Sequence, residues 1–291
     1  MRNIKLAAIQ MASSEDVTAN IEKAEELIRK AASAGAKIIL LPELFERTYF
    51  CQERRYENYA YAHSIDESVA VQMGVRLAKE LEVVLPIPFC ELDNNVIYNS
   101  VAVVDVDGRI LGIYRKTHIP DDHFYQEKFY FTPGDKGFPV FNTRYARIGV
   151  GICWDQWFPE VARSLAINGA ELLLFPSTIG SELILECDSQ EHWRRAMQGH
   201  AACNLMPVIA TNRIGIETIK PHMSNNFQSS SLEFYGSSFI ADATGKIVES
   251  ASRDQEEILY HEFDLDELYS DRMSWSIFRD RRPMIYKDLV K

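Results

Sequence analysis

The feature of this sequence that most constrains its fold is an internal repeat. The run Gly-Ala-Lys-Ile-Ile-Leu-Leu-Pro at residues 35–42 returns half a chain later as Gly-Ala-Glu-Leu-Leu-Leu-Phe-Pro at 169–176. A second pair follows in the same order, Tyr-Asn-Ser-Val-Ala-Val-Val-Asp-Val-Asp-Gly at 98–108 and Tyr-Gly-Ser-Ser-Phe-Ile-Ala-Asp-Ala-Thr-Gly at 235–245. Continuous apolar runs of this kind are typical of strands buried on both faces of a sheet. The chain therefore consists of two copies of one α/β unit.

Each copy predicts the same order of elements, namely strand, helix, strand, helix, strand and hairpin. In the first half we expect them at 4–10, 17–34, 37–43, 67–81, 83–89 and 98–115. In the second half we expect them at 148–152, 159–169, 171–176, 190–205, 207–212 and 235–250, followed by a last strand at 257–263. Two such units pack most simply with their sheets face to face and their helices outside. We therefore predict an α/β fold, a four-layer α-β-β-α sandwich of two pseudo-repeated halves.

Domain organisation follows from the absence of any linker between the halves, so residues 1–263 are expected to form a single domain. Residues 215–231 are polar, and we expect a loop there. Residues 264–291 have no repeat partner and carry Trp275, Phe278 and other large apolar side chains among many charges. We expect this C-terminal extension to pack against another subunit, which predicts a homo-oligomer, a dimer or larger.

Charge and cysteine usage exclude several classes of partner. The net charge of −11 over 291 residues leaves no basic footprint for nucleic acid. No apolar run approaches the ~18 residues that a membrane helix needs, so no membrane partner is expected. The five cysteines are odd in number and none is spaced as C-x-x-C, which indicates a reducing compartment. The apolar run at the N-terminus is too short for a signal peptide, so we expect a cytoplasmic protein.

Chemistry-bearing side chains follow the predicted buried strands. Glu43, Lys116, Cys153 and Ser177 each come directly after a strand, and ligands bind at the carboxyl ends of strands in α/β sheets. Cys153 stands between a glycine-containing strand and a helix that opens at Pro159, a position that favours the thiolate. The alternative interpretation of Cys153 is an inert buried cysteine.

An acid, a lysine and a thiol at neighbouring strand ends suit nucleophilic catalysis. A buried Glu43 could serve as general base, and Lys116 could favour the thiolate and stabilise an oxyanion. Taken singly, Glu43 could form a structural salt bridge and Lys116 could be a solvated charge. His118 and His123 offer a rival Cys–His dyad. Their spacing matches no known metal-ligand pattern, so neither a metal nor another cofactor is expected.

Three motifs resemble the signatures of the nitrilase superfamily of carbon–nitrogen hydrolases. They are Leu-Pro-Glu at 41–43, Tyr-Arg-Lys-Thr-His at 114–118 and Gly-Ile-Cys-Trp-Asp at 151–155. The resemblance spans nearly the whole chain and implies the nitrilase-type α-β-β-α sandwich. It also implies a Glu-Lys-Cys triad, carried here by Glu43, Lys116 and Cys153. A second glutamate of the family, which supports the triad, matches Glu127.

Longer phrases resemble the N-carbamoylputrescine amidases within this superfamily. They are His-Ile-Pro-Asp-Asp-His-Phe-Tyr-Gln-Glu-Lys-Phe-Tyr-Phe at 118–131, Cys-Trp-Asp-Gln-Trp-Phe-Pro-Glu at 153–160 and Ile-Gly-Ser-Glu at 179–182. This resemblance implies hydrolysis of N-carbamoylputrescine to putrescine, carbon dioxide and ammonia through a thiocarbamoyl cysteine, a step of polyamine biosynthesis. The alternatives are an amidohydrolase of N-carbamoyl amino acids or ω-amides, and a nitrilase-like binding protein without turnover.

The cationic substrate predicts a particular pocket. Its far ammonium needs a carboxylate, because an unpaired buried charge is costly, and Glu182 is the candidate. The other interpretation of Glu182 is a solvated loop acid. Tyr49, Trp154 and Ser177 are expected to line the walls. A substrate bearing a carboxylate would instead need an arginine at the pocket end.

Overall fold

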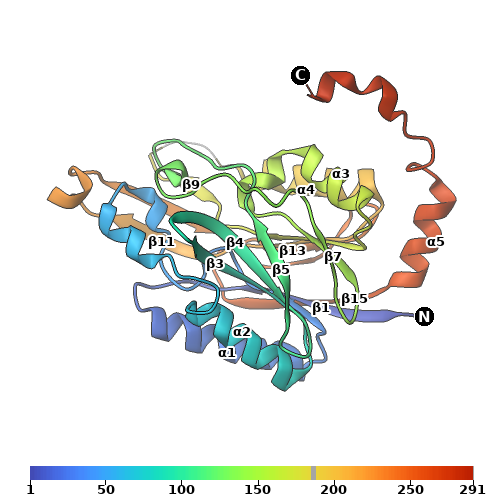
Figure 1. The fold of residues 1–291 in the computed structure, drawn as a ribbon, viewed down its shortest axis with the longest axis horizontal. Coiled ribbons are helices and arrows are strands. Elements are labelled where there is room, and N and C mark those ends of the chain that lie inside the picture. The colour runs from blue at the N-terminus through green and yellow to red at the C-terminus, as the bar shows by residue number, and fades with distance from the viewer. Residues whose placement is uncertain (185–187, 291) are drawn as a thin grey trace.

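Two β-sheets pack face to face, and a pair of helices covers the outer face of each (Figure 1). The computed structural model describes residues 1–184 and 188–290. Cys187, one of the five cysteines counted above, lies outside the described residues. This arrangement is the predicted α-β-β-α sandwich, and each half of the sequence supplies two helices and most of one sheet.

The first half forms a sheet in the order β15-β1-β2-β3-β4-β5. This sheet consists of two three-stranded ladders, β15-β1-β2 and β3-β4-β5. Backbone hydrogen bonds from Ile39 N to Val84 O at 3.1 Å and from Val84 N to Lys37 O at 2.8 Å join them. The strands are β1 (Asn3–Gln10), β2 (Ile38–Leu40), β3 (Leu85–Asp93), β4 (Val96–Val104), β5 (Ile110–Arg115) and β15 (Glu257–Asp264), and the helices are α1 (Val17–Ser33) and α2 (Val69–Leu81).

The second half repeats this plan in the order β6-β7-β8-β10-β13-β14. In both halves the first strands run parallel, as expected when helices connect them. The strands are β6 (Val140–Asn142), β7 (Arg147–Val150), β8 (Leu172–Pro176), β10 (Val208–Thr211), β13 (Phe239–Ala241) and β14 (Ile247–Ser250), and the helices are α3 (Pro159–Ile167) and α4 (Gln190–Asn204).

Alternation of side chains along each buried strand fills two cores at once. On β8, Leu172 and Leu174 enter the core between the two sheets, whereas Leu173 and Phe175 pack under α3 and α4. On β2, Ile38 and Leu40 face the core between the sheets in the same way, and Ile39 faces the helices. Strands that are covered on both faces must be apolar at every position, which is why they read as continuous runs in the sequence.

The segment 215–231, predicted as a loop, is instead part of a hairpin. β11 (Ile214–Ile219) pairs with β12 (Ser230–Tyr235), and β9 (Gly180–Glu182) adds a third strand. The prediction was wrong because the usual alternation is reversed in the middle of β11: the apolar Ile216 is 62% exposed, while the next residue, the buried Glu217, is paired with Arg213 at 2.8 Å. Tyr235 consequently ends β12, and β13 begins only at Phe239.

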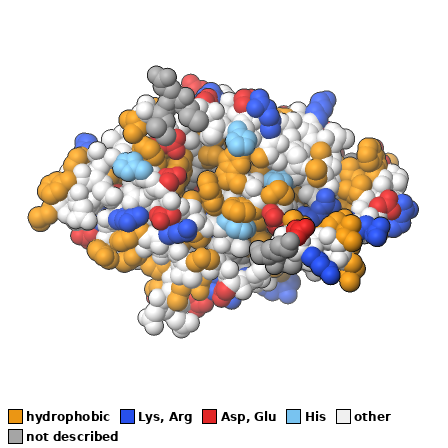
Figure 2. All heavy atoms as spheres, turned by 90° about the horizontal axis from the view of Figure 1, so that it is seen from above, with side chains coloured by type: hydrophobic (Ala, Val, Ile, Leu, Met, Phe, Trp, Pro, Cys, Tyr) orange, Lys and Arg blue, Asp and Glu red, His pale blue; other side chains and the backbone are white. Residues whose placement is uncertain are grey.

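The C-terminal residues extend beyond the two sheets. Helix α5 (Leu265–Trp275) follows β15 directly (Figure 1). The chain after α5 passes the outer side of α3, where Arg163 lies over the ring of Phe278 at 5.2 Å. Figure 2 views the molecule from the side of α3 and α4 and shows apolar side chains gathered on that face. In the part of the chain that the structure describes, no helix combines the length and apolar character needed to cross a membrane.

Candidate active site

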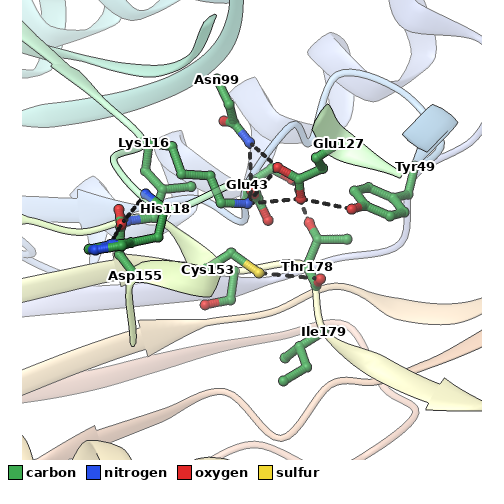
Figure 3. Close-up of polar contacts among 12 residues, drawn as sticks. Glu43, Tyr49, Asn99, Lys116, His118, Glu127, Cys153, Asp155, Thr178 and Ile179 are labelled. Atoms are coloured by element: carbon green, nitrogen blue, oxygen red, sulfur yellow. Dashed lines mark hydrogen bonds and ion pairs between the residues drawn. The ribbon is translucent and has the colours of Figure 1, made fainter. Parts of the chain in front are cut away.

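The three predicted catalytic side chains come together where their strands end between the sheets (Figure 3). Glu43 follows β2, Lys116 follows β5 and Cys153 follows β7. Lys116 Nζ lies 2.9 Å from Glu43 Oε1, and neither side chain is exposed to solvent. The sheets bring these segments together because both pseudo-repeated halves place their strand ends at the same edge of the sandwich.

Glu43 keeps one carboxylate oxygen free. Its Oε1 accepts hydrogen bonds from Lys116 Nζ and, at 2.7 Å, from Asn99 Nδ2. Its Oε2 is buried and accepts no hydrogen bond from any described residue. A buried carboxylate oxygen with an unused lone pair can take a proton from a neighbouring thiol or water, which is the requirement for a general base.

The backbone of Glu43 is fixed from the second half of the chain. Its carbonyl accepts from Arg213 Nη2 at 3.0 Å and from Thr178 Oγ1 at 3.0 Å. Arg213 Nη2 also bonds to the carbonyl of Leu44, a residue held in the left-handed region at φ 48°. Arg213 therefore stabilises a strained turn directly after Glu43.

Glu127 supports Lys116 from the opposite side. Lys116 Nζ donates to both Glu127 oxygens, at 2.8 and 2.7 Å, and Tyr49 Oη donates to Glu127 Oε1 at 2.7 Å. Burial lowers the pKa of Lys116, but the charges of Glu127 and Glu43 outweigh it, so its pKa stands well above the ordinary value. Burial also raises the pKa of Glu127 despite the opposing effect of Lys116. Lys116 is thus a permanent cation that can face a developing oxyanion.

Cys153 is a thiol at rest, contrary to the expected thiolate. Burial, followed by the charge of Glu43, raises its pKa well above the ordinary value, and Lys116 only partly opposes this. The helix predicted from Pro159 begins there as α3, and a short 3₁₀ turn, η4 (Cys153–Trp157), separates its N-terminus from the thiol. Cys153 itself has φ 42°, and its Sγ donates to Thr178 O at 3.5 Å. Attack by this sulfur therefore requires a base.

The two candidate histidines do not contact the thiol. His118 Nδ1 lies 2.8 Å from Asp155 Oδ1, and its ring stacks on Phe158 with centroids 3.6 Å apart. His123 packs edge-on against Phe124. Among the described residues, no hydrogen bond joins Cys153 to a histidine, and no group of three side chains suited to hold a metal ion occurs.

A pocket of about 230 Å³ opens onto Cys153. Glu182 and Asp122 both line it, and the described lining residues include no lysine or arginine. Burial and then the charge of Asp122 raise the pKa of Glu182, as expected for two neighbouring acids. The remaining lining residues are Pro120, Tyr125, Trp154, Gln156, Trp157, Thr178, Ile179, Gly180 and Ser189. The pocket therefore combines an aromatic wall with two carboxylates.

The structure separates the four predicted substrate-binding residues into two groups. Trp154 and Glu182 line the pocket. Tyr49 and Ser177 are fully buried behind its walls: the Tyr49 hydroxyl bonds to Glu127, and Ser177 Oγ donates to Gln156 Oε1 at 3.1 Å. Ser177 points away from the pocket, whereas the next residue lines it: the backbone carbonyl of Thr178 accepts from the Cys153 thiol, and the Thr178 hydroxyl donates to the carbonyl of Glu43.

Several site residues escaped the sequence analysis. Asn99 donates to the carboxylate of Glu43, and Arg213 donates to the backbone carbonyl of Glu43. Asn99 begins the repeated hairpin segment and carried a usable signal, since a polar residue in a buried strand needs a partner. Asp122 and Tyr125 stood within the recognised phrase at 118–131. Arg213 carried no signal of its contact with the site, because it reaches Glu43 and Leu44 through their backbone carbonyls, far away in the sequence.

Comparison with known proteins agrees with this geometry. The chain matches the carbon–nitrogen hydrolase family over residues 5–273. It is 52% identical over 288 residues to an N-carbamoylputrescine amidase of Oryza sativa subsp. japonica, covering 99% of this chain and 94% of that protein. It is 49% identical over 292 residues to a citrullinase of Francisella tularensis, covering 100% of this chain and 99% of that protein.

A solved structure gives the same result for the fold. The carbon–nitrogen hydrolase from Helicobacter pylori G27 matches with a TM-score of 0.91 at 37% identity, over 99% of both chains. The predicted nitrilase-type sandwich is thus confirmed. The chain belongs to the carbon–nitrogen hydrolase family, whose members act on carbon–nitrogen bonds other than peptide bonds.

Proposed function

We propose that this enzyme hydrolyses N-carbamoylputrescine to putrescine, carbon dioxide and ammonia, with Glu43, Lys116 and Cys153 as its catalytic residues. The single observation that carries the choice of substrate is the pair of carboxylates, Glu182 and Asp122, in a pocket whose described lining has no basic side chain. A full-length relative that is an N-carbamoylputrescine amidase supports the same choice.

The first half of the reaction forms a thiocarbamoyl enzyme. Glu43 Oε2 takes the proton of the Cys153 thiol, and Sγ attacks the carbamoyl carbon. The oxyanion is stabilised by Lys116 Nζ and by the N–H of Trp154, which stands in the first turn of a 3₁₀ helix, where N–H groups lack intrahelical partners. The carbon–nitrogen bond to the terminal amino group then breaks, and Glu43 returns the proton so that ammonia leaves.

The second half restores the thiol. Glu43 takes a proton from a water molecule, which attacks the thiocarbamoyl carbon, and the carbon–sulfur bond breaks as Cys153 recovers that proton. The product is the carbamate of putrescine, which releases carbon dioxide and leaves the free amine. Glu127 holds Lys116 in place throughout, because both of its oxygens bond to the ammonium.

The pocket supports recognition of the far ammonium. Glu182 and Asp122 supply negative charge, and Trp154 and Trp157 supply aromatic faces whose ring centroids lie 6.5 Å apart. Cations are attracted to aromatic faces and to carboxylates alike. The methylene groups of the substrate would lie between these side chains and the thiol.

Citrulline is the second candidate substrate, favoured by the 49% identity to a citrullinase. It carries the same carbamoyl group, but its far end bears a carboxylate beside the ammonium. That carboxylate would face Glu182 and Asp122 without a lysine or arginine among the described lining residues. Like charges at close range are unfavourable, so the pocket supports the simple amine over the amino acid.

The decisive experiment measures ammonia release from N-carbamoylputrescine, L-citrulline, N-carbamoyl-β-alanine and glutamine in parallel. We expect the highest kcat/KM for N-carbamoylputrescine. Preference for an acid-bearing substrate would keep the catalytic residues and overturn the proposed specificity. No ammonia from any of them would favour a binding protein without turnover.

We also propose that the reaction takes place in the cytoplasm. The described cysteines are all unpaired: Cys51, Cys90, Cys153 and Cys203. Free thiols, one of them catalytic, are typical of a reducing compartment. Fractionation of producing cells, with the activity recovered outside the cytosolic fraction, would contradict this proposal.

A further inference from the structure

Asp155 is a fully buried carboxylate that stands two residues after Cys153 and outside the proposed chemistry. It takes part in four hydrogen bonds. Its Oδ2 accepts from Ile152 N at 3.0 Å and from Tyr114 Oη at 2.6 Å. Its Oδ1 accepts from His118 N at 3.0 Å and faces His118 Nδ1 at 2.8 Å. A buried carboxylate with this many donors is a fixed structural centre.

The donors come from the two segments whose relative position the reaction needs. Ile152 directly precedes Cys153, whose φ of 42° places the thiol on a strained turn. Tyr114 and His118 stand on either side of Lys116 in the chain. In the described structure, every side-chain hydrogen bond between residues 114–118 and 152–155 ends on Asp155 (Figure 3 shows the His118 side of this contact).

The geometry points to Asp155 as the positioning residue that sets the placement of Lys116 relative to Cys153. This inference rests on the proposed function only in assuming that these two residues act in one reaction. Asp155 does not touch the substrate. Its carboxylate binds both the turn that carries Cys153 and the segment that carries Lys116. The two segments are therefore held in one fixed relative position.

The two oxygens of Asp155 are not exchangeable for an amide. Each of them accepts one backbone N–H, from Ile152 or from His118. A backbone N–H cannot reverse its role, so the Asp155→Asn side chain would set its NH₂ group against one of these donors whichever way it turned. Tyr114 stays protonated and continues to donate, since burial and then the charge of Asp155 raise its pKa well above the ordinary value.

The test compares Asp155→Asn with Tyr114→Phe in a Cys203→Ser background, which removes an exposed thiol. For each variant, kcat and KM are measured, and kcat is divided by the folded fraction from circular dichroism. We expect Asp155→Asn to lower kcat per folded molecule about tenfold to a hundredfold, because misplacement near 1 Å has effects of that size. KM should change less than about threefold, since the far pocket is intact. Tyr114→Phe should lose only a few-fold.

Two outcomes overturn the inference. One is a wild-type kcat per folded molecule in Asp155→Asn, which makes Asp155 merely structural if the melting temperature also falls; the other is a rise in KM that accounts for the whole loss in kcat/KM, which would place Asp155 in substrate binding. If Asp155→Asn does not fold, the double variant Tyr114→Phe/His118→Ala cuts both side-chain ties and keeps the two backbone bonds. It should lower kcat per folded molecule with KM retained, and an unchanged kcat contradicts the proposal.

A readout that needs no substrate separates this inference from the proposed function. Iodoacetamide labelling of Cys153, followed by peptide mapping, reports how well the thiol is placed against its base. Asp155→Asn should slow labelling of Cys153 about fivefold or more if the turn moves. Slower labelling without ammonia release from any substrate would keep the positioning role and reject the substrate. Unchanged labelling together with an unchanged kcat rejects the role itself.

Discussion

Lys116 Nζ lies 2.9 Å from Glu43 Oε1 in a region where both side chains are wholly buried. Removing two charges from water costs several kcal/mol per ion, and a buried pair often adds nothing to stability compared with apolar residues. In the mechanism that we propose, the pair serves the chemistry: the second oxygen of Glu43, which accepts no hydrogen bond from a described residue, acts as the base, and the charge of Lys116 faces the oxyanion. An apolar core could supply neither group.

Replacing the buried cation should damage both activity and stability. In Lys116→Met, two carboxylates remain buried without a counter-charge. We expect turnover to fall by about 100-fold or more and the free energy of unfolding to fall by about 3–5 kcal/mol at neutral pH. Denaturant unfolding and ammonia release measure the two effects. Lys128→Met, which removes an exposed lysine next to Glu127, should change neither.

The stability of Lys116→Met should depend on pH in a defined direction. Burial already raises the pKa of Glu127 in the wild type, and loss of the cation raises it further. A carboxyl group whose pKa is raised by folding stabilises the protein below its unfolded pKa and loses that contribution as the pH rises. The deficit of Lys116→Met should therefore shrink as the pH falls from neutral toward the unfolded pKa of a glutamate, about 4.3. A constant deficit would show that the carboxylates are not the cause.

Reactivity of Cys153 should depend on Glu43. Burial and the charge of Glu43 raise the pKa of the thiol, so it reacts only when Glu43 accepts its proton. Labelling of Cys153 by iodoacetamide should be slower in Glu43→Gln by about tenfold or more, within the usual range for a general base. The exposed Cys203 serves as an internal control in the same peptide map. Equal labelling of Cys153 in both proteins would argue against Glu43 as the base.

The buried thiols predict a loss of stability in mild alkali. Burial raises the pKa of Cys51, Cys90 and Cys153. Each thiol is protonated in the folded state while the unfolded thiol ionises near pH ~8.5, so each lowers the unfolding free energy by about 1.4 kcal/mol per pH unit above that pH. Denaturant titrations at pH 8.5 to 9.5, as a rough window below tyrosine ionisation, should show a shallower slope for Cys51→Ala. The exposed Cys203→Ala should keep the wild-type slope.

The far end of the pocket should bind positive charge. Glu182→Gln and Asp122→Asn each remove one pocket carboxylate, and each should raise KM for N-carbamoylputrescine about tenfold, the effect of one charge-assisted hydrogen bond. Because burial and Asp122 raise the pKa of Glu182, the wild-type KM should rise as the pH falls toward that pKa. Glu191→Gln, on the exposed face of α4, is the matched control. An unchanged KM in Glu182→Gln would remove Glu182 from the site.

We propose that residues 264–291 pack against a second subunit, as the sequence suggested. Trp275 is 67% exposed and Met284 is 81% exposed in the single chain. Large exposed apolar side chains that are close together usually mark an interface. Sedimentation at micromolar concentration should show an oligomer that Trp275→Glu weakens. Ile216→Glu, at a position 62% exposed on β11, should not. A monomeric wild type would contradict the proposal.

Much of the fold and the core of the site could be predicted from the sequence because their signals are local. An apolar run such as 171–176 reports that its own strand is covered on both faces, and the cores on the two sides of β8 confirm this. The three motifs each place one reactive side chain after a strand, and the repeat brings those strand ends to one edge. The same reasoning failed for the β11 hairpin, which was predicted as a loop. There the buried side chains include the polar pair Glu217 and Arg213, which an apolar pattern does not reveal.

The sequence by itself determined the layers, the order of the repeated elements along the chain and the candidate catalytic residues. Only the tertiary structure decided that the Cys153 thiol has a raised pKa, that one oxygen of Glu43 accepts no hydrogen bond from a described residue, and that Thr178 and not Ser177 lines the pocket. These properties depend on charges and donors from segments far apart in the chain; Lys116 and Glu43, for example, are separated by 73 positions. A pattern along the chain records whether a side chain is buried, but the electrostatic environment of that side chain is set by its neighbours in space.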